Sequence, residues 1–303
     1  MDINFFKKTR ILDGGMGQEL LARGMKPQGT LWSATAILNE KYHKLLYDTH
    51  VDYIKAGAEV IVTTTFASRK IRLRENKVED KFEYLNKTAG ELAKKTKEIY
   101  PDILIAGGLP PQNLTYKEDN RSSDEISQDF YEHAKLLNPY SDFFYLDVIS
   151  SVRELELAIK SIHEFKKPYL IGAHISRGKT MPSGEKISDI IRNKKNDNLL
   201  GLILSCVSPE NFLLNLDELK NLGIPFGFKL NSYIKTNPFP NLDEHEKDKK
   251  SVDPKEFLGT RKDLSPKRMA RFAKKFKDSG ATILGGCCET SPKHIQEFSK
   301  LLK

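Results

Sequence analysis

Short apolar runs recur along the chain, and most are followed by a polar stretch in which apolar residues return at every third or fourth position. Continuous apolar runs are typical of parallel strands buried on both faces, whereas the longer period is typical of helices with one buried side. The pattern predicts eight strands, at Ile11–Gly15, Glu59–Phe66, Ile103–Leu109, Asp142–Ile149, Tyr169–Ile175, Leu199–Val207, Ile224–Leu230 and Ala281–Cys288.

Helices are predicted in the segments between these runs. Three of them end directly before a glycine, at Gly57, Gly223 and Gly280. Glycine commonly terminates a helix because it adopts a positive φ without steric cost. The predicted helices are Asn39–Ala56, Lys81–Tyr100, Ile126–Leu137, Ser151–Phe165, Ile187–Asn193, Pro209–Leu222 and Pro266–Ser279.

The alternation predicts an α/β fold, a (β/α)8 TIM barrel that forms a single domain over residues 1–303. A doubly wound open sheet is the alternative. Two polar stretches depart from the repeat, Pro110–Asp124 and a charged insertion at about residues 235–265. In a barrel both would lie at the C-terminal ends of the strands, so they are candidate substrate loops or lids. The second could equally be a surface insertion without such a role.

All three cysteines of the chain fall at predicted strand ends. Cys206 ends the sixth strand, and Cys287 and Cys288 end the eighth. In a closed barrel these ends converge on one mouth, and three thiolates there would suit zinc, which keeps a fourth position open when it is catalytic. The alternative is that they are small buried residues in tight strand ends. The preceding pair Gly285–Gly286 favours the metal, because it suggests backbone close to a ligand.

Four segments together resemble the homocysteine S-methyltransferase family. GATILGGCCETSPKHI is similar to the family's terminal signature, in which a glycine pair precedes two zinc-ligand cysteines, and ILSCVSPE is similar to the segment with the first zinc cysteine. ILDGGMGQELLARG resembles the opening strand and helix, and AGAEVIVTTTFASRK resembles the second strand. The resemblance extends from about Arg10 to Leu302.

The resemblance implies a TIM barrel in which Cys206, Cys287 and Cys288 bind Zn²⁺ and the thiol of homocysteine takes the fourth position. A methyl group then passes to that thiol from a small cationic donor, S-methylmethionine, S-adenosylmethionine or betaine, and methionine is formed. Zinc at +2 with three thiolates carries a net charge of −1, which attracts a cationic donor. Such a transfer needs alignment more than proton transfer, so no general base is expected.

Other family positions carry over one at a time. Asp13, followed by Gly14, matches the acidic residue that helps to hold the amino-acid end of homocysteine, although a carboxylate there could also cap the strand end. Asp147 stands where the family usually has glutamate, one methylene longer. Thr64 and Thr65 could bond the substrate carboxylate, or be present for strand propensity alone. Asn231 matches an asparagine near the metal, with a turn residue as the alternative.

Several residues near the expected mouth differ from the family pattern or add to it. Ser205 replaces the usual asparagine, Glu289 follows the cysteine pair where glycine is common, and AGGLPPQNL replaces a glycine-proline loop. His174 ends the fifth strand and could contact the substrate. Trp32 and Phe66 are expected near the mouth, where aromatic faces would suit a cationic donor, although core packing is their ordinary role.

Charge and composition limit the partners. The 49 basic and 41 acidic side chains give a net charge of +8, and both signs are interleaved, so no nucleic-acid-binding surface is predicted. No apolar run resembles a secretory signal or a membrane span. Three cysteines cannot pair completely, which favours a reducing, cytoplasmic location. The expected partners are a small thiol acceptor and a methyl donor, and the oligomeric state stays open.

Three other functions remain at this point. The chain could activate homocysteine for a separate methyl-corrinoid protein, or be a related thiol methyltransferase with a different acceptor. It could also be a non-catalytic barrel whose zinc is structural or whose thiols sense oxidation.

Overall fold

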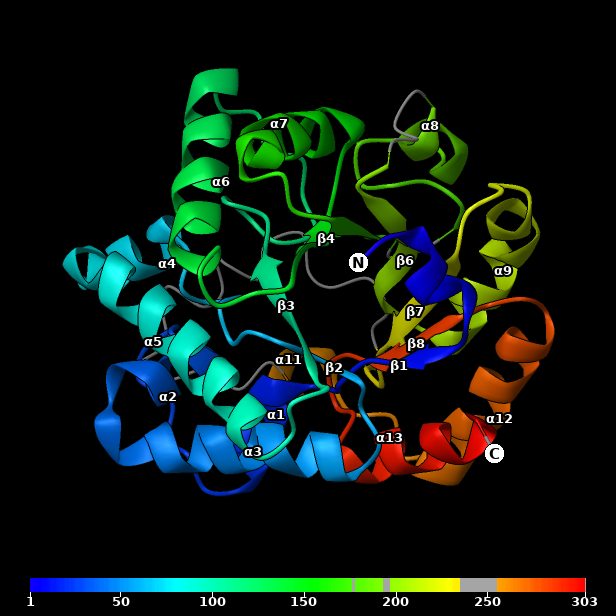
Figure 1. Cartoon of the computed structure of the whole chain (residues 1–303), viewed down its shortest axis with the longest axis horizontal. Coiled ribbons are helices and arrows are strands. Elements are labelled where there is room, and N and C mark those ends of the chain that lie inside the picture. Colours follow the sequence, from blue (N-terminus) through cyan, green and yellow to red (C-terminus); the bar gives the residue numbers. More distant parts are fainter. Residues whose placement is uncertain (176–177, 193–196, 235–254, 303) are drawn as a thin grey trace.

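The computed structural model describes residues 1–175, 178–192, 197–234 and 255–302 (Figure 1). Its eight strands form a single parallel sheet in the order β1-β8-β7-β6-β5-β4-β3-β2. The strands are β1 Arg10–Ile11, β2 Val60–Val62, β3 Leu104–Leu109, β4 Phe143–Ile149, β5 Tyr169–Ala173, β6 Leu199–Val207, β7 Phe226–Leu230 and β8 Ile283–Gly286.

The two end strands of this order close on each other. Leu12 pairs in parallel with Val60, Asp13 N donates to Val60 O at 3.0 Å, and Glu59 N donates to Ile11 O at 2.8 Å. A doubly wound open sheet would leave its end strands apart. The (β/α)8 barrel is therefore confirmed and the open-sheet alternative is wrong.

Helices surround the sheet (Figure 1). All seven predicted helices form, with ends within a few residues of the predicted positions. The α-helices are α1 Met16–Ala22, α2 Thr35–Leu38, α3 His43–Lys55, α4 Lys70–Glu75, α5 Phe82–Lys95, α6 Ser123–Leu137, α7 Val152–Ile162, α8 Ile187–Ile191, α9 Pro209–Lys220, α11 Lys255–Leu258, α12 Pro266–Asp278 and α13 Pro292–Ser299.

Local sequence signals explain where these helices begin and end. Ser208 and Ser265 cap α9 and α12 by accepting hydrogen bonds from backbone N–H groups three residues ahead, and a proline follows each serine. The glycines predicted to end helices have φ values of 105° at Gly57, 68° at Gly223 and 103° at Gly280. These conformations are the ones that glycine adopts without a steric penalty.

Several strands are shorter than predicted, most clearly β1, β2 and β8. β8 ends at Gly286, so Cys287 and Cys288 directly follow the strand that they were predicted to end. β1 ends at Ile11 and β2 at Val62, whereas the apolar and threonine-rich runs continue to Gly15 and Phe66. After β2, Thr65 N donates to Thr63 O, so the backbone turns out of the sheet. Of the charged insertion, residues 235–254 lie outside the described residues. Lys255–Leu258 forms α11, and Leu258 is buried in a cluster with Cys206 and Tyr233.

The barrel interior is filled from its N-terminal end. Phe6, on the 3₁₀ helix Ile3–Lys7, is fully buried and contacts the ring of Phe143 edge-on, with centroids 6.0 Å apart. It packs in one cluster with inward-facing residues of six strands and with Leu12: Val60, Ala106, Phe143, Tyr145, Leu170, Leu200, Ile203 and Ile283. This core blocks the axis, so access to the interior is from the C-terminal end of the strands.

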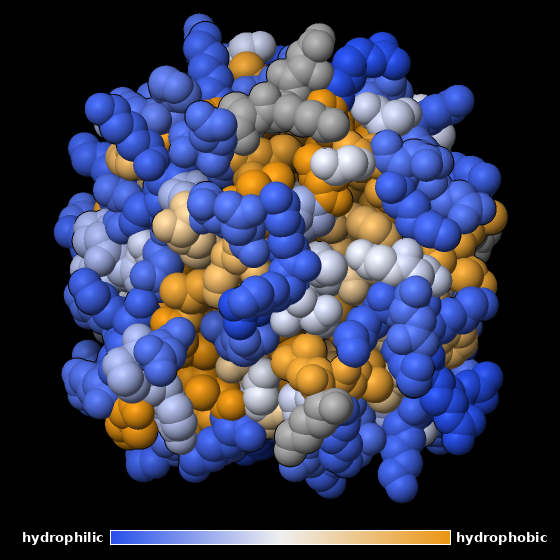
Figure 2. All heavy atoms as spheres, turned by 45° about the vertical axis from the view of Figure 1, so that its right-hand side comes forward, coloured by the Kyte–Doolittle hydropathy of each residue, from blue (hydrophilic) through white to orange (hydrophobic). Residues whose placement is uncertain are grey.

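The outer surface is mostly polar. On the face in Figure 2, hydrophilic side chains cover most of the surface and apolar atoms are visible chiefly between them. Among the described helices, none combines the length and apolar character that crossing a lipid bilayer requires.

Phe6→Ala tests the role of the buried ring at the base of the barrel. Removing it should lower the free energy of unfolding by about 3–5 kcal/mol, because it leaves a cavity between strands that cannot collapse together. Chemical denaturation measures the loss. Phe5→Ala is the matched control, since Phe5 is only partly buried and should cost clearly less. An equal loss of unfolding free energy in the two variants would contradict the role of Phe6 in filling the base of the barrel.

Candidate active site

The three cysteines meet at the C-terminal mouth of the barrel. The Sγ atoms of Cys206 and Cys288 are 3.7 Å apart, those of Cys287 and Cys288 are 4.0 Å apart, and all three lie within 4.8 Å of one another. Tetrahedral zinc with Zn–S bonds of about 2.3 Å separates its sulfur ligands by roughly 3.8 Å. The three thiols therefore fit one zinc ion, with a fourth position left for another ligand.

A bulge in β6 brings Cys206 into this cluster. Along the strand, Ser205 faces the barrel interior and hydrogen-bonds to Tyr145, so regular alternation would turn Cys206 outward. The pairing of β6 with β7 shifts between Ser205 and Val207, and Cys206 has a φ of 54°. Asn231 Nδ2 donates to Cys206 O at 2.5 Å and lies 3.7 Å from its Sγ. The bulge therefore turns the thiol back to the mouth.

A matching bulge occurs in β4. The pairing with β5 shifts between Leu146 and Ile149, and Val148 has a φ of 59°, which is costly for a β-branched residue. Val148 packs in the cluster that contains Cys206 and Cys288. β-bulges often re-aim side chains at barrel rims and active sites, and both bulges here border the cysteine cluster.

The thiols favour a cation electrostatically. Hydrogen bonds from Cys287 and Cys288 hold the pKa of Cys206 well below its ordinary value. The pKa values of Cys287 and Cys288 are raised, because each shares its proton with Cys206 and because both are buried. The protein alone thus stabilises one thiolate, and a divalent cation would be needed to ionise all three.

The glycine pair before the cysteines serves packing within the protein. A Cβ atom on Gly286 would collide with the side chain of Thr290 and would lie 3.2 Å from Gly14 Cα. A Cβ atom on Gly285 would lie 3.1 Å from Lys229 Cγ, so both glycines make close contacts within the protein, and the expectation that the pair approaches a ligand stays a prediction. Glu289 has a φ of 60°, which gives a physical reason why glycine is common after the cysteine pair in the family.

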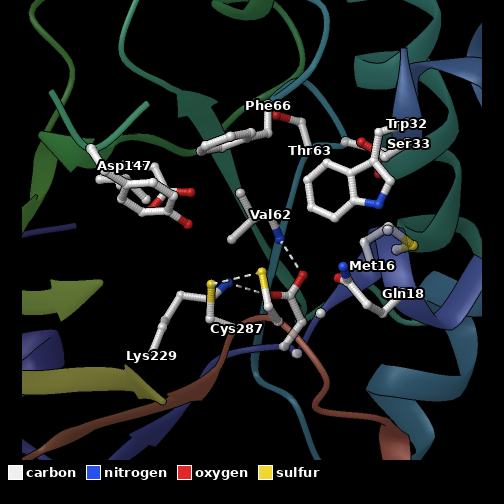
Figure 3. Close-up of a pocket in the computed structure, with 18 residues that line it drawn as sticks. Met16, Gln18, Trp32, Ser33, Val62, Thr63, Phe66, Asp147, Lys229 and Cys287 are labelled. Atoms are coloured by element: carbon white, nitrogen blue, oxygen red, sulfur yellow. Dashed lines mark hydrogen bonds and ion pairs between the residues drawn. The ribbon is translucent and has the colours of Figure 1, made fainter. Parts of the chain in front are cut away.

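A cavity opens beside the sulfurs at the mouth of the barrel. In Figure 3, Trp32 and Phe66 form one side of it and Cys287 lies on the other. The rings of Trp32 and Phe66 meet edge-on, with centroids 6.3 Å apart. The lining residues are Asp13, Gly14, Gly15, Met16, Gly17, Gln18, Trp32, Ser33, Val62, Thr63, Thr64, Phe66, Tyr116, Asp147, Val148, Lys229, Cys287 and Cys288.

Asp13 is engaged by the protein itself. Its Oδ1 accepts a hydrogen bond from Lys229 Nζ at 2.9 Å, and its Oδ2 accepts one from Val62 N at 2.8 Å. Lys229 lies on β7 and is 6% exposed. Burial tends to lower the pKa of Lys229, but the charges of Asp13 and Asp147 outweigh this effect, so its pKa is raised.

Asp147 has a free oxygen. It lines the cavity from the end of β4, and its buried Oδ1 has no hydrogen-bond partner among the described residues. Burial raises the pKa of Asp147 to about 6, against the opposing effect of Lys229. Between the two predicted carboxylates, Asp147 is therefore the one that offers an unpaired acceptor atom.

The other predicted substrate contacts lie at different depths. Gly14 and Thr64 line the cavity, whereas the hydroxyl of Thr65 donates to Gly108 O at 2.7 Å and braces the wall from behind. His174 is fully buried, and its ring packs against Tyr116 with centroids 4.3 Å apart. Thr65 and His174 thus support residues of the cavity wall and do not line it.

The loop after β3 contributes a residue that the sequence analysis did not identify. Tyr116 lies within the predicted loop Pro110–Asp124, and its hydroxyl donates to Cys206 Sγ at 3.3 Å. Gln18 also lines the cavity, with its Nε2 2.8 Å from the Tyr233 hydroxyl. Lys229 carried a signal that went unused, because a lysine inside the apolar run of a buried strand requires a charged partner.

Comparison with known proteins places this arrangement in a family. A family model described as homocysteine S-methyltransferase matches residues 10–302. The chain belongs to the homocysteine S-methyltransferase family.

The relatives within this family cover nearly the whole chain. Homocysteine S-methyltransferase 1 of Saccharomyces cerevisiae is 27% identical over 322 residues, which cover 96% of this chain and 93% of that protein. The Escherichia coli homocysteine S-methyltransferase is 23% identical over 309 residues, covering 94% and 92% respectively. These matches assign the enzyme class, an S-methyltransferase of the homocysteine S-methyltransferase type.

A solved structure shares the fold. The homocysteine methyltransferase MmuM from Escherichia coli in its metallated form superposes with a TM-score of 0.78 at 20% identity, over 97% of this chain and 96% of that one. The family resemblance predicted from the sequence motifs is thus confirmed by the family model, and the barrel by the structural neighbour.

Asp147→Asn tests the buried carboxylate. In metal-free protein, the native Asp147 binds its proton more tightly than the unfolded chain does, with a pKa of about 6 against 3.8. The free energy of unfolding should therefore fall by roughly 2–3 kcal/mol as the pH rises from about 4 to about 6. Denaturation between pH 4 and 7, with a chelator present, measures this slope.

Asp147→Asn should remove the decrease in unfolding free energy between about pH 4 and pH 6 that comes from Asp147. The control is Asp142→Asn, because Asp142 is an aspartate near the opposite end of the same strand, where it bonds Lys97 and Ile105 N. A variant at Asp147 that keeps the full pH dependence would show that another group carries it.

Proposed function

We propose that this protein transfers a methyl group from a small cationic donor to the thiol of homocysteine, and that the acceptor thiol is held by Zn²⁺ at Cys206, Cys287 and Cys288. The observation that carries the proposal is the approach of three thiols at the mouth of the barrel beside a cavity. Family membership gives the reaction type and favours homocysteine as the acceptor.

Zinc is favoured by the chemistry of the donor set. Three sulfur ligands at near-tetrahedral spacing suit zinc better than the oxygen-preferring cations, and the related MmuM is described as metallated. A bound zinc ion would keep the acceptor sulfur deprotonated and nucleophilic at neutral pH.

The chain's own residues support this site from outside the cluster. Tyr116 donates to the sulfur of Cys206, and Asn231 fixes the backbone of the same residue. A hydroxyl donor directed at the sulfur stabilises its thiolate form, and the Asn231 bond holds the bulge that aims it. The role of Asn231 as a direct metal or substrate ligand stays a prediction.

The acceptor's amino-acid end is assigned to the floor of the cavity. The unpaired Oδ1 of Asp147 suits an ammonium group, while Asp13 acts through Lys229. Gly14 and Thr64 line the same space. Thr65 would act by holding the wall and not by direct contact.

The donor's charge is matched by the opposite wall. Trp32 and Phe66 present aromatic side chains to the cavity there, and aromatic faces attract sulfonium and quaternary ammonium groups. Tyr116 also lines the cavity but lies on the thiol side, beside Cys206. With thiolates on one side and aromatic rings on the other, a cationic donor is favoured throughout its path to the acceptor. No group is needed as a general base, so the wall residues serve to align the two substrates.

We further propose that the chain acts as a single domain in the cytoplasm with small-molecule partners and no nucleic acid or membrane. The three free thiols favour a reducing compartment.

Methionine formation tests the reaction directly. Zinc-loaded protein is incubated with homocysteine and a pool of S-methylmethionine, S-adenosylmethionine and betaine, and methionine is measured by mass spectrometry. Chelator-sensitive methionine is expected, and splitting the pool then identifies the donor. No methionine from protein shown to hold zinc would overturn the proposed acceptor or donor class.

Cys287→Ala should abolish zinc binding and methyl transfer together, because two thiolates cannot supply the site. Bound zinc is measured by elemental analysis after dialysis. The control is Ser205→Ala, which alters the residue next to Cys206 and leaves all three thiols in place. Full activity in the Cys287 variant would refute the zinc assignment.

Trp32→Leu should raise KM for the donor about 5- to 30-fold with little change in KM for homocysteine, since a desolvated cation–aromatic contact is worth about 1–2 kcal/mol. Steady-state kinetics with each substrate varied in turn separates the two effects. Tyr84→Leu, an exposed aromatic on α5, is the control. A rise in KM confined to homocysteine would show that the donor does not bind at Trp32.

A further inference from the structure

Lys229 is the cation that faces the cavity. Among the described lining residues it is the one lysine or arginine, and its side chain enters from β7 at the cavity floor beside Cys287 (Figure 3). Its neighbours on the strand, Phe228 and Leu230, are fully buried apolar residues. A charge at this point in a buried strand has to be compensated, and the ion pair with Asp13 does so.

The ion pair leaves donor capacity unused. A lysine ammonium group has three N–H donors. Within the described part of the chain, one of them is directed to Asp13 Oδ1, and the ammonium also lies 5.8 Å from the centroid of the Tyr145 ring. Asp13 is in turn completed by Val62 N. Donors of Lys229 therefore remain for a group that enters the cavity.

The surroundings of Lys229 select the charge of that group. Asp147 and Cys287 both lie within its electrostatic reach, and the unpaired Oδ1 of Asp147 lines the same cavity. Among the charged groups that line the cavity, Lys229 is the one that attracts a carboxylate, whereas Asp13 and Asp147 repel it. An acceptor with both an ammonium and a carboxylate group can satisfy Asp147 and Lys229 at once.

We propose that Lys229 is a specificity-determining residue that holds the carboxylate of the acceptor, so that the cavity selects thiols bearing a carboxylate. This inference rests on the proposed function. It also gives Asp13 a role. Asp13 orients Lys229 and balances its charge, and so acts on the acceptor indirectly.

Three acceptor thiols distinguish the contribution of the ammonium group to binding from that of the carboxylate group. L-homocysteine carries both groups, 4-sulfanylbutanoate lacks the ammonium, and 3-aminopropane-1-thiol lacks the carboxylate. In Lys229→Met, kcat/KM should fall about 10- to 100-fold for the two carboxylates, which is the effect of losing a charge-assisted hydrogen bond. The value for the aminothiol should not fall.

A purely structural role for Lys229 predicts a different pattern. If the lysine served only to stabilise the protein, its removal would change kcat/KM by the same factor for all three acceptors. That result overturns the inference. The matched control is Lys97→Met. Lys97 lies away from the cavity, and its Nζ is 2.8 Å from Asp142 Oδ1. This variant should have the same kcat/KM as wild type for all three acceptors.

A second comparison guards against misfolding. Lys229→Met leaves Asp13 buried and unpaired, which can cost several kcal/mol. The variant Asp13→Asn and the double variant D13N/K229M both lack the buried carboxylate. They differ only at position 229, so the ratio of their kcat/KM values gives the effect of the lysine alone. The selective loss for carboxylate-bearing thiols should persist in this pair, and its absence would contradict the inference.

Binding to metal-free protein separates this inference from the proposed function. Calorimetry compares methionine with 3-(methylsulfanyl)propan-1-amine, the same molecule without its carboxylate. Wild type should prefer methionine, and Lys229→Met should abolish the preference. Equal affinities in wild type would refute the role of Lys229 even if methyl transfer is observed, whereas a preserved preference without methyl transfer would refute only the proposed reaction.

Discussion

Closure of the sheet between β1 and β2 is the constraint on which the site depends. These are the two shortest strands, and the contact between them consists of the Leu12–Val60 bridge and a few backbone hydrogen bonds. The same junction bonds Asp13 Oδ2 to Val62 N, while Asp13 Oδ1 receives Lys229 from β7, which is separated from β1 only by β8. Without closure, Asp13 would lose its bond to Val62, and the carboxylate that orients Lys229 would no longer be held from both sides.

Charge in the cavity is arranged so that few groups remain unpaired. Asp13 and Lys229 compensate each other, the thiols share protons, and Asp147 is kept partly neutral by burial near neutral pH. Such an arrangement stays stable without substrate and still offers one acceptor oxygen and one cation to an incoming zwitterion. The residues that balance the charge of the cavity are thus the same ones that we propose to hold the acceptor.

The sequence predicted the elements with strong local signals. Helices with serine caps, proline starts and terminal glycines fall where expected, and the cysteines could be assigned because all three lie at strand ends. Features that depend on tertiary contacts were missed. The bulges at Val148 and Cys206 have no glycine to mark them, and Lys229 is 216 residues from its partner Asp13.

The spacing of the cysteines has a consequence for the stability of the whole chain. Cys206 and Cys288 are 82 residues apart and lie on strands separated by β7. An ion bound to both would act as a removable cross-link that closes a long loop of the chain and spans three neighbouring strands. The free energy of folding, and with it the melting temperature, would then depend on the concentration of free metal.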